Sequence, residues 1–262
     1  MALIVKRTVL VTGGARRIGA AIVRVLAGEG HRVVIHHHDS PGEATALAQA
    51  LDPTGDAVAT VAGDLAAEGA GARLIAAARS AIGRPIDGLV NCASVFEFDA
   101  PAAFDPALLA RLVPVNLAAP IALVEAMAAQ PELEDGAVVN ILDQKVANLN
   151  PDFLSYTLTK VALEGATTML AQAFAPRLRV NAVSPGLTLP SGDQTPDEFA
   201  AVASENLLRR PVPVDEIGRA VAFLLTCPAI TGQNLFVDNG QRFLPRDGDV
   251  MFANKPKDHL RG

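Results

Sequence analysis

The chain has 262 residues, 50% of them hydrophobic, and a formal net charge of −6. This length is enough to bury one large hydrophobic core. The acidic balance, together with the lack of a basic stripe carrying interleaved aromatic residues, argues against a nucleic-acid-binding surface.

The sequence predicts neither a membrane span nor a signal peptide. No run reaches about eighteen uninterrupted apolar residues, and the segment before Lys6 is too short for a signal peptide. Cys92 and Cys227 are the two cysteines, which suits a reducing compartment better than a disulfide framework. We therefore expect a cytoplasmic protein with no membrane or nucleic-acid partner.

Short β-branched segments alternate along the chain with segments rich in Ala and Leu. We expect strands at 6–12, 31–38, 57–64, 88–94, 136–142, 179–184 and 233–238. We expect helices at 17–29, 41–52, 66–82, 105–130, 152–175 and 214–226. This alternation predicts an α/β fold with a doubly wound, seven-stranded parallel sheet flanked by helices. No linker or repeat divides the chain, so residues 1–262 are expected to form a single domain.

A glycine-rich turn follows the first expected strand and precedes a helical pattern. Its sequence is Thr12-Gly13-Gly14-Ala15-Arg16-Arg17-Ile18-Gly19. Glycines let the backbone approach a pyrophosphate, and the helix behind them directs free N–H groups and its positive dipole end toward that anion. An ordinary tight turn is the alternative, but the strand-turn-helix context favours dinucleotide binding. The candidate cofactor residues here are Gly13, Arg16, Arg17, Ile18 and Gly19.

The end of the second strand gives conflicting indications about the cofactor. It reads His36-His37-His38-Asp39-Ser40, and Asp39 lies twenty positions after Gly19. An acid at this interval binds ribose hydroxyls of NAD and repels a 2′-phosphate. Arg16, the three histidines and Ser40 could instead receive a phosphate together if a histidine is protonated, with His38 the histidine expected at the cofactor. We predict NADP(H), with NAD(H) left open because of Asp39.

The three histidines of this strand also suggest a metal site. His36 and His38 share a strand face, but no nearby cluster supplies third and fourth ligands at zinc spacing. We expect exposed histidines at a strand end and no metal.

An acid, a phenol and an amine follow the fifth strand at spacings suited to proton transfer. Asp143 precedes Tyr156 by thirteen positions, and Lys160 lies one helical turn beyond Tyr156. A neighbouring ammonium is expected to lower the phenol pKa from about 10 and make it a usable acid or base. Such a pair also arises by chance in helices, and Asp143 could instead cap a local loop.

These motifs together resemble the short-chain dehydrogenase/reductase family, from about Arg7 to about Gly240. Further landmarks agree in order and spacing: Asp64-Leu65, Asn91-Cys92-Ala93-Ser94, Asn116 and Pro185-Gly186. The resemblance implies a single-domain Rossmann fold and a catalytic role for Asn116, which would hold a proton-relay water. It also implies cofactor contacts at Asp64, Leu65, Asn91, Ala93, Ser94, Tyr156, Lys160, Pro185, Gly186 and Thr188.

Three departures from the common family pattern are similar to the pteridine reductases. Arg17 replaces a glycine of the turn, Asp143 replaces the usual serine, and Phe96 follows Ser94 where a glycine normally ends the motif. The resemblance implies that Phe96 stacks a flat heterocycle, for which an aromatic face is suited. The implied substrate residues are Arg17, Ser94, Phe96, Asp143 and Tyr156. A buried Phe96, or an Arg17 that neutralises cofactor phosphates, are the alternatives.

Two segments lie outside the alternating pattern. Residues 187–212 contain several prolines and acids where the family has its substrate loop, which closes over substrate or is a plain surface loop. Residues 241–262 form a polar C-terminal tail. Family resemblance implies a homotetramer, with the helices near 105–130 and 152–175 at one interface.

The sequence therefore predicts an enzyme that transfers hydride from NADPH to a dihydropterin-like heterocycle. Tyr156 donates the proton, Lys160 holds the ribose and Asp143 supports protonation, because a carboxyl can hold and release a proton where a hydroxyl cannot. A carbonyl reductase for a ketone or 3-oxoacyl substrate is the first alternative. A cofactor-binding sensor without turnover is the second, since fold alone does not prove function.

Overall fold

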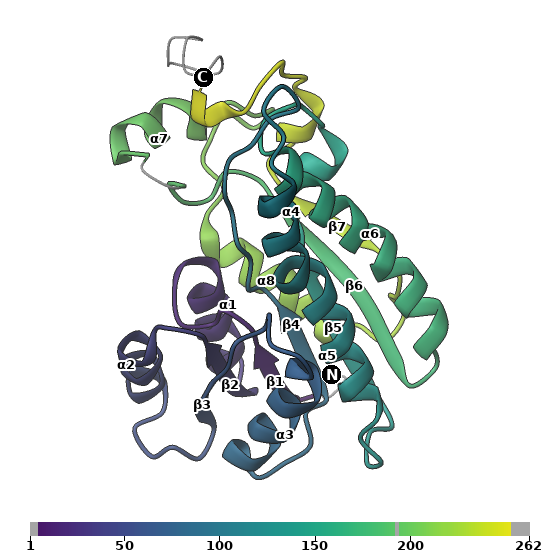
Figure 1. Ribbon diagram of the computed structural model, residues 1–262. Coiled ribbons are helices and arrows are strands. Elements are labelled where there is room, and N and C mark those ends of the chain that lie inside the picture. Colours follow the sequence, from purple (N-terminus) through teal and green to yellow (C-terminus); the bar gives the residue numbers. More distant parts are fainter. Residues whose placement is uncertain (1–4, 192–193, 253–262) are drawn as a thin grey trace.

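The computed structural model describes residues 5–191 and 194–252. Within these residues, seven parallel strands form one sheet in the order β3-β2-β1-β4-β5-β6-β7 (Figure 1). The strands are β1 (Thr8–Val11), β2 (Arg32–His37), β3 (Val58–Ala62), β4 (Gly88–Asn91), β5 (Gly136–Ile141), β6 (Leu178–Pro185) and β7 (Asn234–Val237). Because β1 pairs with both β2 and β4, the strand order reverses there, as in a doubly wound sheet.

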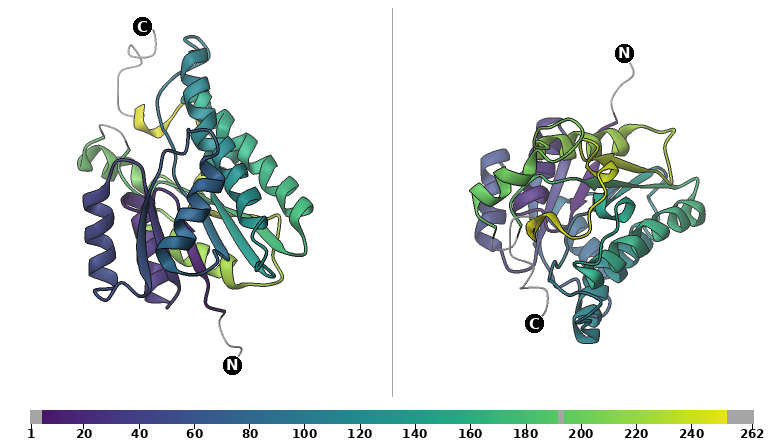
Figure 2. Two further views of the ribbon diagram at one scale, coloured as in Figure 1. Left: turned by 60° about the horizontal axis from the view of Figure 1, so that its bottom comes forward. Right: turned by 90° about the horizontal axis from the view of Figure 1, so that it is seen from above.

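Helices cover both faces of this sheet (Figure 2). They are α1 (Arg17–Gly28), α2 (Pro41–Leu51), α3 (Ala70–Ile82), α4 (Pro106–Val113), α5 (Ala119–Ala128), α6 (Leu154–Phe174), α7 (Pro196–Ala203) and α8 (Val214–Thr226). Successive side chains of a strand point to opposite faces. Val9 and Val11 thus enter the core beneath α1 and α8, whereas Leu10 enters the core beneath α3 and α5. Burial on both faces explains why the strands are continuous apolar runs.

The predicted α/β fold and its seven-stranded parallel sheet are confirmed. Strand and helix ends differ from the expectation by a few residues, because element ends carry the weakest periodic signal. The strand expected at 88–94 ends at Asn91, so the polar residues that follow it are free to face a cavity. The helix expected at 66–82 begins at Ala70, after a left-handed Gly69.

The segment expected as one helix over 105–130 contains a local widening. It consists of α4, a π-helical stretch Pro114–Ala118 (η1) and α5. By length and composition, the continuous run Pro106–Ala128 could cross a membrane, although apolar helices of soluble proteins meet the same criterion. The absence of a membrane span stays a prediction.

The segment 187–212 is partly helical rather than a plain loop. Thr195 begins α7 with a reciprocal capping box: its side chain accepts from the Glu198 N–H, and the Glu198 side chain accepts from the Thr195 N–H. Short 3₁₀ turns at Gln241–Phe243 (η3) and Val250–Phe252 (η4) complete the described chain. Figure 1 shows α7 and this C-terminal part at the end of the molecule where α6 begins. Residues 192–193 of the expected substrate loop and 253–262 of the expected tail lie outside the described residues.

Candidate functional site

A cavity of about 950 Å³ opens at the carboxyl ends of the strands. Open α/β sheets bind ligands at this edge, where the strand order reverses. Most of the predicted site residues line it: Gly13, Arg16, Arg17, Ile18, Gly19, His38, Asp39, Ser40, Asp64, Leu65, Ala93, Ser94, Phe96, Asp143, Tyr156, Lys160, Pro185, Gly186 and Thr188. Asn91 and Asn116 are the described candidates that do not line it.

The glycine turn forms a tight cradle on one side of the cavity. Gly13 has a φ of +62°, and a Cβ there would lie 2.9 Å from the Ala93 Cα. A Cβ at Gly19 would lie 2.1 Å from the Gly13 carbonyl oxygen. Helix α1 then begins at Arg17 with no side-chain cap among the described residues, so its first N–H groups are open to a ligand. This cradle fits the pyrophosphate of a dinucleotide.

His36 fixes the glycine turn to the rest of the sheet. The Gly13 N–H donates to the His36 Nδ1 at 3.2 Å, so the proton is on Nε2, which donates to the Gly63 carbonyl at 3.1 Å. Burial lowers the pKa of His36 to about 4. The expectation of exposed histidines is wrong for His36 and His37, which are buried, and holds for His38. Their strand is covered on both faces, which the run of three consecutive histidines did not indicate.

Asp39, the residue that favours NAD in the sequence, forms an ion pair with Arg16. The Arg16 guanidinium lies 3.4 Å from the Asp39 carboxylate and 3.7 Å from that of Glu43. Ser40 donates its hydroxyl to the same Asp39 oxygen at 3.2 Å. His37 lines this part of the cavity, and its buried Nδ1 has no hydrogen-bond partner among the described residues. A guanidinium beside Asp39 and an unpartnered ring nitrogen of His37 are compatible with a phosphate ligand.

Asp143 makes both a local cap and a contact with Tyr156. Its Oδ1 accepts the Lys145 N–H at 2.9 Å and thereby caps the 3₁₀ turn Gln144–Ala147 (η2). Its Oδ2 accepts the Tyr156 hydroxyl at 3.1 Å. Capping fixes the carboxyl in place, and the second oxygen remains available to the phenol. Asp143 and Tyr156 thus form a preorganised acid pair at the cavity wall.

The pKa of Tyr156 is raised well above 10, first by burial and then by the charge of Asp143 and the hydrogen bond to it. The expectation of a lowered phenol pKa is therefore wrong for the protein without ligand, because burial and Asp143 outweigh any effect of Lys160. The Lys160 ammonium donates to the Ile141 carbonyl at 2.9 Å and lies 5.6 Å from the Tyr156 ring centre. Burial also raises the pKa of Asp143 and lowers that of Lys160. In the protein without ligand the phenol of Tyr156 is therefore neutral.

The two predicted asparagines act behind the cavity wall. Asn116, in the π-helical stretch, exchanges hydrogen bonds with the Val95 backbone at 2.8 and 2.9 Å and donates to the Thr159 hydroxyl. It thus ties the segment that carries Ser94 to helix α6. Asn91 donates to the Asn140 side chain at 2.8 Å within the sheet. Their predicted catalytic and cofactor roles stay predictions.

Phe96 stands in an aromatic group at the mouth of the cavity. Its ring stacks on Phe153 with centroids 4.2 Å apart and meets Tyr156 edge-on at 4.7 Å. It is 38% exposed, so it is not the buried aromatic of the alternative interpretation. Arg17 has a partner that the sequence did not indicate, since its guanidinium donates to the Pro190 carbonyl at 2.5 Å. It joins the glycine turn to the loop after β6.

Several residues that line the cavity were not predicted. They include Cys92, Gln144, Lys145, Asn148, Asn150, Gln241, Arg246, Asp249, Val250 and Met251. Lys145 could have been suspected, because it follows Asp143 by two positions at a strand end. Nothing in the sequence of the C-terminal tail marks Asp249, which reaches the cavity through a long-range contact.

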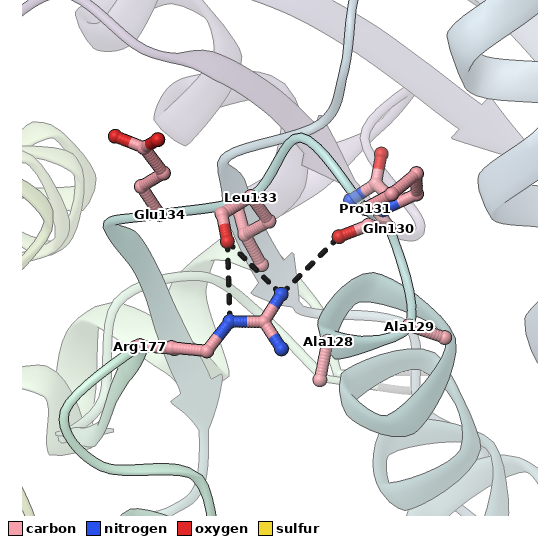
Figure 3. Close-up of a pocket in the computed structure, with 7 residues that line it drawn as sticks. All are labelled: Ala128, Ala129, Gln130, Pro131, Leu133, Glu134 and Arg177. Atoms are coloured by element: carbon pink, nitrogen blue, oxygen red, sulfur yellow. Dashed lines mark hydrogen bonds between the residues drawn. The ribbon is translucent and has the colours of Figure 1, made fainter.

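A second cavity lies away from these residues and carries none of them. Figure 3 shows Arg177 beside Ala128 and Ala129 at the end of α5, with its guanidinium donating to the Gln130 and Leu133 carbonyls. Arg177 uses these hydrogen bonds to connect the turn before β6 to the loop after α5. No group of three or more potential metal-binding side chains occurs in the described ranges 5–191 and 194–252.

Comparison with known proteins gives matches over nearly the whole chain. A family model described as enoyl-(acyl carrier protein) reductase matches residues 13–242. The crystal structure of FolM alternative dihydrofolate reductase 1 from Brucella suis, in complex with NADP, is 45% identical with a TM-score of 0.88, covering 93% of this chain and 98% of that one. Pteridine reductase 1 of Leishmania tarentolae is 31% identical over 281 residues, 88% of this chain and 94% of that protein. Carbonyl reductase family member 4 of Danio rerio is 32% identical over 247 residues, 91% and 99% of the two chains.

The raised pKa of Tyr156 can be tested directly, because it is the only tyrosine and the chain has no tryptophan. Ultraviolet absorbance of the phenolate therefore reports this one group. We expect no phenolate in the folded protein up to about pH 10, the range in which a free phenol titrates. Asp143→Asn removes a negative charge and should move the titration to lower pH, with circular dichroism checking that the fold persists. A phenolate that forms below the pKa of free tyrosine in the unaltered protein would contradict the assignment.

Proposed function

Because the chain belongs to the short-chain dehydrogenase/reductase family of oxidoreductases, we propose that it reduces a dihydropterin or a similar planar heterocycle with hydride from NADPH. The observation that carries this proposal is the Tyr156 hydroxyl bonded to Asp143 in a cavity beside the glycine turn. FolM and pteridine reductase 1, by their names reductases of dihydrofolate and pteridines, are similar to this chain over most of its length.

The cofactor would lie along the glycine turn and the strand ends. Gly13, Gly19 and the start of α1 would hold the pyrophosphate, and Arg16 with Ser40 would hold the 2′-phosphate. For this, Arg16 exchanges part of its pairing with Asp39 for the phosphate. Lys160, already at the cavity wall, would hold a ribose hydroxyl. When bound, NADPH supplies the hydride.

The acid pair provides the proton that the heterocycle needs. Reduction of a C=N bond places hydride on carbon and requires a proton on nitrogen, and Tyr156 donates it. Because burial raises the pKa of Asp143, this carboxyl would take up a proton more readily than an exposed one and could return it to the phenolate. Asp143 would thus be the second member of a proton relay, and its Oδ1 is held in place by the Lys145 N–H.

The cavity beside this acid pair suits a flat, polar ring. Phe96 stacks on Phe153, contacts Tyr156 and is 38% exposed at the cavity, so part of its ring surface could contact a planar ligand. Ser94 and Gln144 line the same cavity, and the Gln144 Oε1 is buried without a hydrogen-bond partner among the described residues. An unpaired acceptor favours a ligand that carries N–H donors, as pterins do. Arg17 would then serve the substrate through its hold on the loop at Pro190.

A carbonyl reductase is the second candidate. It is favoured by the similarity to carbonyl reductase family member 4 and by the family model named for an acyl-carrier reductase. The same Tyr156 proton would serve a ketone. The polar lining near Asp143 and the aromatic group at Phe96 are less suited to an acyl chain, which needs an apolar channel.

We also infer that the protein is a cytoplasmic homotetramer, as the family resemblance implies, and that the outer face of α6 forms one of its interfaces. Leu158, Val161 and Met169 are exposed on it at helical spacing, and a Cβ added at Gly165 between them would meet nothing within 4 Å. An apolar stripe of this kind with an open glycine allows close helix packing against a second copy.

The function is tested by NADPH and NADH oxidation with dihydrobiopterin, dihydromonapterin, dihydrofolate and a panel of ketones. We expect turnover of a pterin that falls by about a thousandfold or more in Tyr156→Phe, because general acid catalysis is lost. Asp143→Ala should also abolish turnover and leave the Kd for NADPH nearly unchanged. Turnover with ketones alone supports the carbonyl reductase, and full activity of Asp143→Ala removes that residue from the reaction. NADPH binding without turnover of any compound supports the sensor.

The cofactor assignment is tested by Arg16→Ala. A guanidinium-phosphate contact is worth about 1.5–3 kcal/mol, so KM for NADPH should rise by roughly 10- to 100-fold, with little change for NADH. Arg24→Ala is the matched control, since Arg24 is an exposed arginine of the same helix. An equal effect on both cofactors would show that Arg16 does not contact the 2′-phosphate.

The oligomeric state is tested by light scattering. We expect four times the chain mass of 27.2 kDa, and a smaller species for Met169→Glu, because a buried charge in the interface is unfavourable. Leu208→Glu, at an exposed leucine outside α6, is the control. A monomer in the unaltered protein rejects the inference.

A further inference from the structure

A buried ion pair connects the C-terminal segment, residues 244–252, to the turn that follows Asp143. The Lys145 side chain is 4% exposed, and its ammonium lies 3.0 Å from the Asp249 carboxylate. The same ammonium donates to the Asp152 carbonyl at 2.6 Å. Lysines are almost never buried without such partners, because the charge loses its hydration. The sequence distance between Lys145 and Asp249 is 104 residues, so this contact is made only by the folded chain.

Backbone contacts fix the C-terminal segment at the same point. The Asp152 carboxylate accepts the Asp249 N–H at 2.6 Å, and the Asp249 carboxylate accepts the Met251 N–H at 3.0 Å. A Cβ at Gly248 would lie 2.8 Å from the Asp152 carboxylate, so the chain passes close to the start of α6. Beyond it, the Phe252 ring stacks toward Phe153 at 6.0 Å.

This segment is a wall of the substrate cavity. Asp249, Val250 and Met251 line it together with Asp143 and Tyr156. Lys145, which binds the C-terminal segment, is therefore only two positions along the chain from Asp143, whose carboxyl accepts the Tyr156 hydroxyl. A loss of the ion pair would free the wall and remove a charge next to the reacting groups.

We propose that Lys145 and Asp249 are positioning residues for the reaction: their ion pair holds the C-terminal segment as a wall of the substrate cavity and places a second carboxylate beside the Asp143-Tyr156 acid pair. The electrostatic part of this proposal rests on the proposed function, in which that pair supplies the proton. Neither Lys145 nor Asp249 touches the reacting atoms in it. They act through Asp143 and through the shape of the cavity.

The charges around the acid pair agree with this role. After burial, which is the largest cause, Asp249 raises the pKa of Asp143 and Lys145 lowers it. Asp249 also raises the pKa of Tyr156, after burial and Asp143. The other titratable groups that face the pair are Lys160 and Cys92. Lys145 and Asp249 therefore have opposite effects on the acid pair, although they belong to one structural contact.

Two single variants separate the structural effect from the electrostatic one. Lys145→Met and Asp249→Asn both break the ion pair, so both should speed hydrogen exchange of residues 244–252 and raise KM for dihydrobiopterin by about tenfold, with an unchanged Kd for NADPH. Arg79→Met and Glu132→Gln break an ion pair of the same 3.0 Å length away from the cavity and are the matched controls. Exchange and KM should not change in them.

The pH profile of kcat/KM supplies the readout that a structural role alone would not move. The reaction needs the protonated pair, so activity falls as pH rises through its pKa. Removal of the negative charge in Asp249→Asn should move this fall to lower pH, and removal of the positive charge in Lys145→Met should move it to higher pH, each by roughly half a unit or more. Shifts in the same direction, or none, overturn the electrostatic part.

The outcomes also separate this inference from the proposed function. Full activity of Tyr156→Phe, or no turnover of dihydrobiopterin, counts against the proposed function, whereas hydrogen exchange of residues 244–252 needs no substrate and still tests the wall. Unchanged exchange in both Lys145→Met and Asp249→Asn overturns the wall whatever the substrate is. If Lys145→Met fails to fold, Asp249→Asn, which preserves the side-chain shape, decides between the outcomes.

Discussion

Burial of the sheet on both faces is the constraint from which the rest of the structure follows. The strands carry apolar side chains on both sides, and helices must cover each of them to remove this surface from water. Covering both faces of a parallel sheet requires crossover connections, which bring every strand to an end at the same edge. The glycine turn after β1, the histidines of β2 and Asp143 after β5 meet there although they are distant in sequence. The site is a consequence of the packing that stabilises the fold.

The same burial controls the chemistry of the acid pair. A buried phenol and a buried carboxyl both favour their neutral forms, because the charged forms lose hydration. In the protein without ligand this effect exceeds the influence of Lys160, whose ammonium is turned toward the Ile141 carbonyl. In the protein without ligand the pair therefore keeps the phenol proton, and a bound ligand that changes the charge near Tyr156 would also change its pKa.

Cofactor selectivity shows how a neighbouring charge changes the meaning of a single residue. Asp39 alone would favour NAD, since a bare carboxylate repels a phosphate. In the folded chain Arg16 comes within 3.4 Å of it and Ser40 donates to it. Arg16 thus offsets part of the negative charge of Asp39 and Glu43, and its guanidinium lies where it could also contact a 2′-phosphate. The comparison with the NADP complex of FolM agrees with this interpretation.

The sequence by itself determined the layered α/β fold, the glycine turn and the series Asp143, Tyr156 and Lys160. Each of these can be recognised from local periodicity or from the short spacing between residues. The ends of helices and strands differ from the sequence prediction by a few residues. Helix α7 was not predicted, because the prolines and acidic residues around its capping box are also typical of loops. Only the tertiary structure decided the direction of the Tyr156 pKa, the pairing of Arg16 with Asp39, the Arg17 contact with Pro190 and the approach of Asp249 to the acid pair. These depend on burial and on contacts between residues up to 173 positions apart, for which a linear pattern carries no signal.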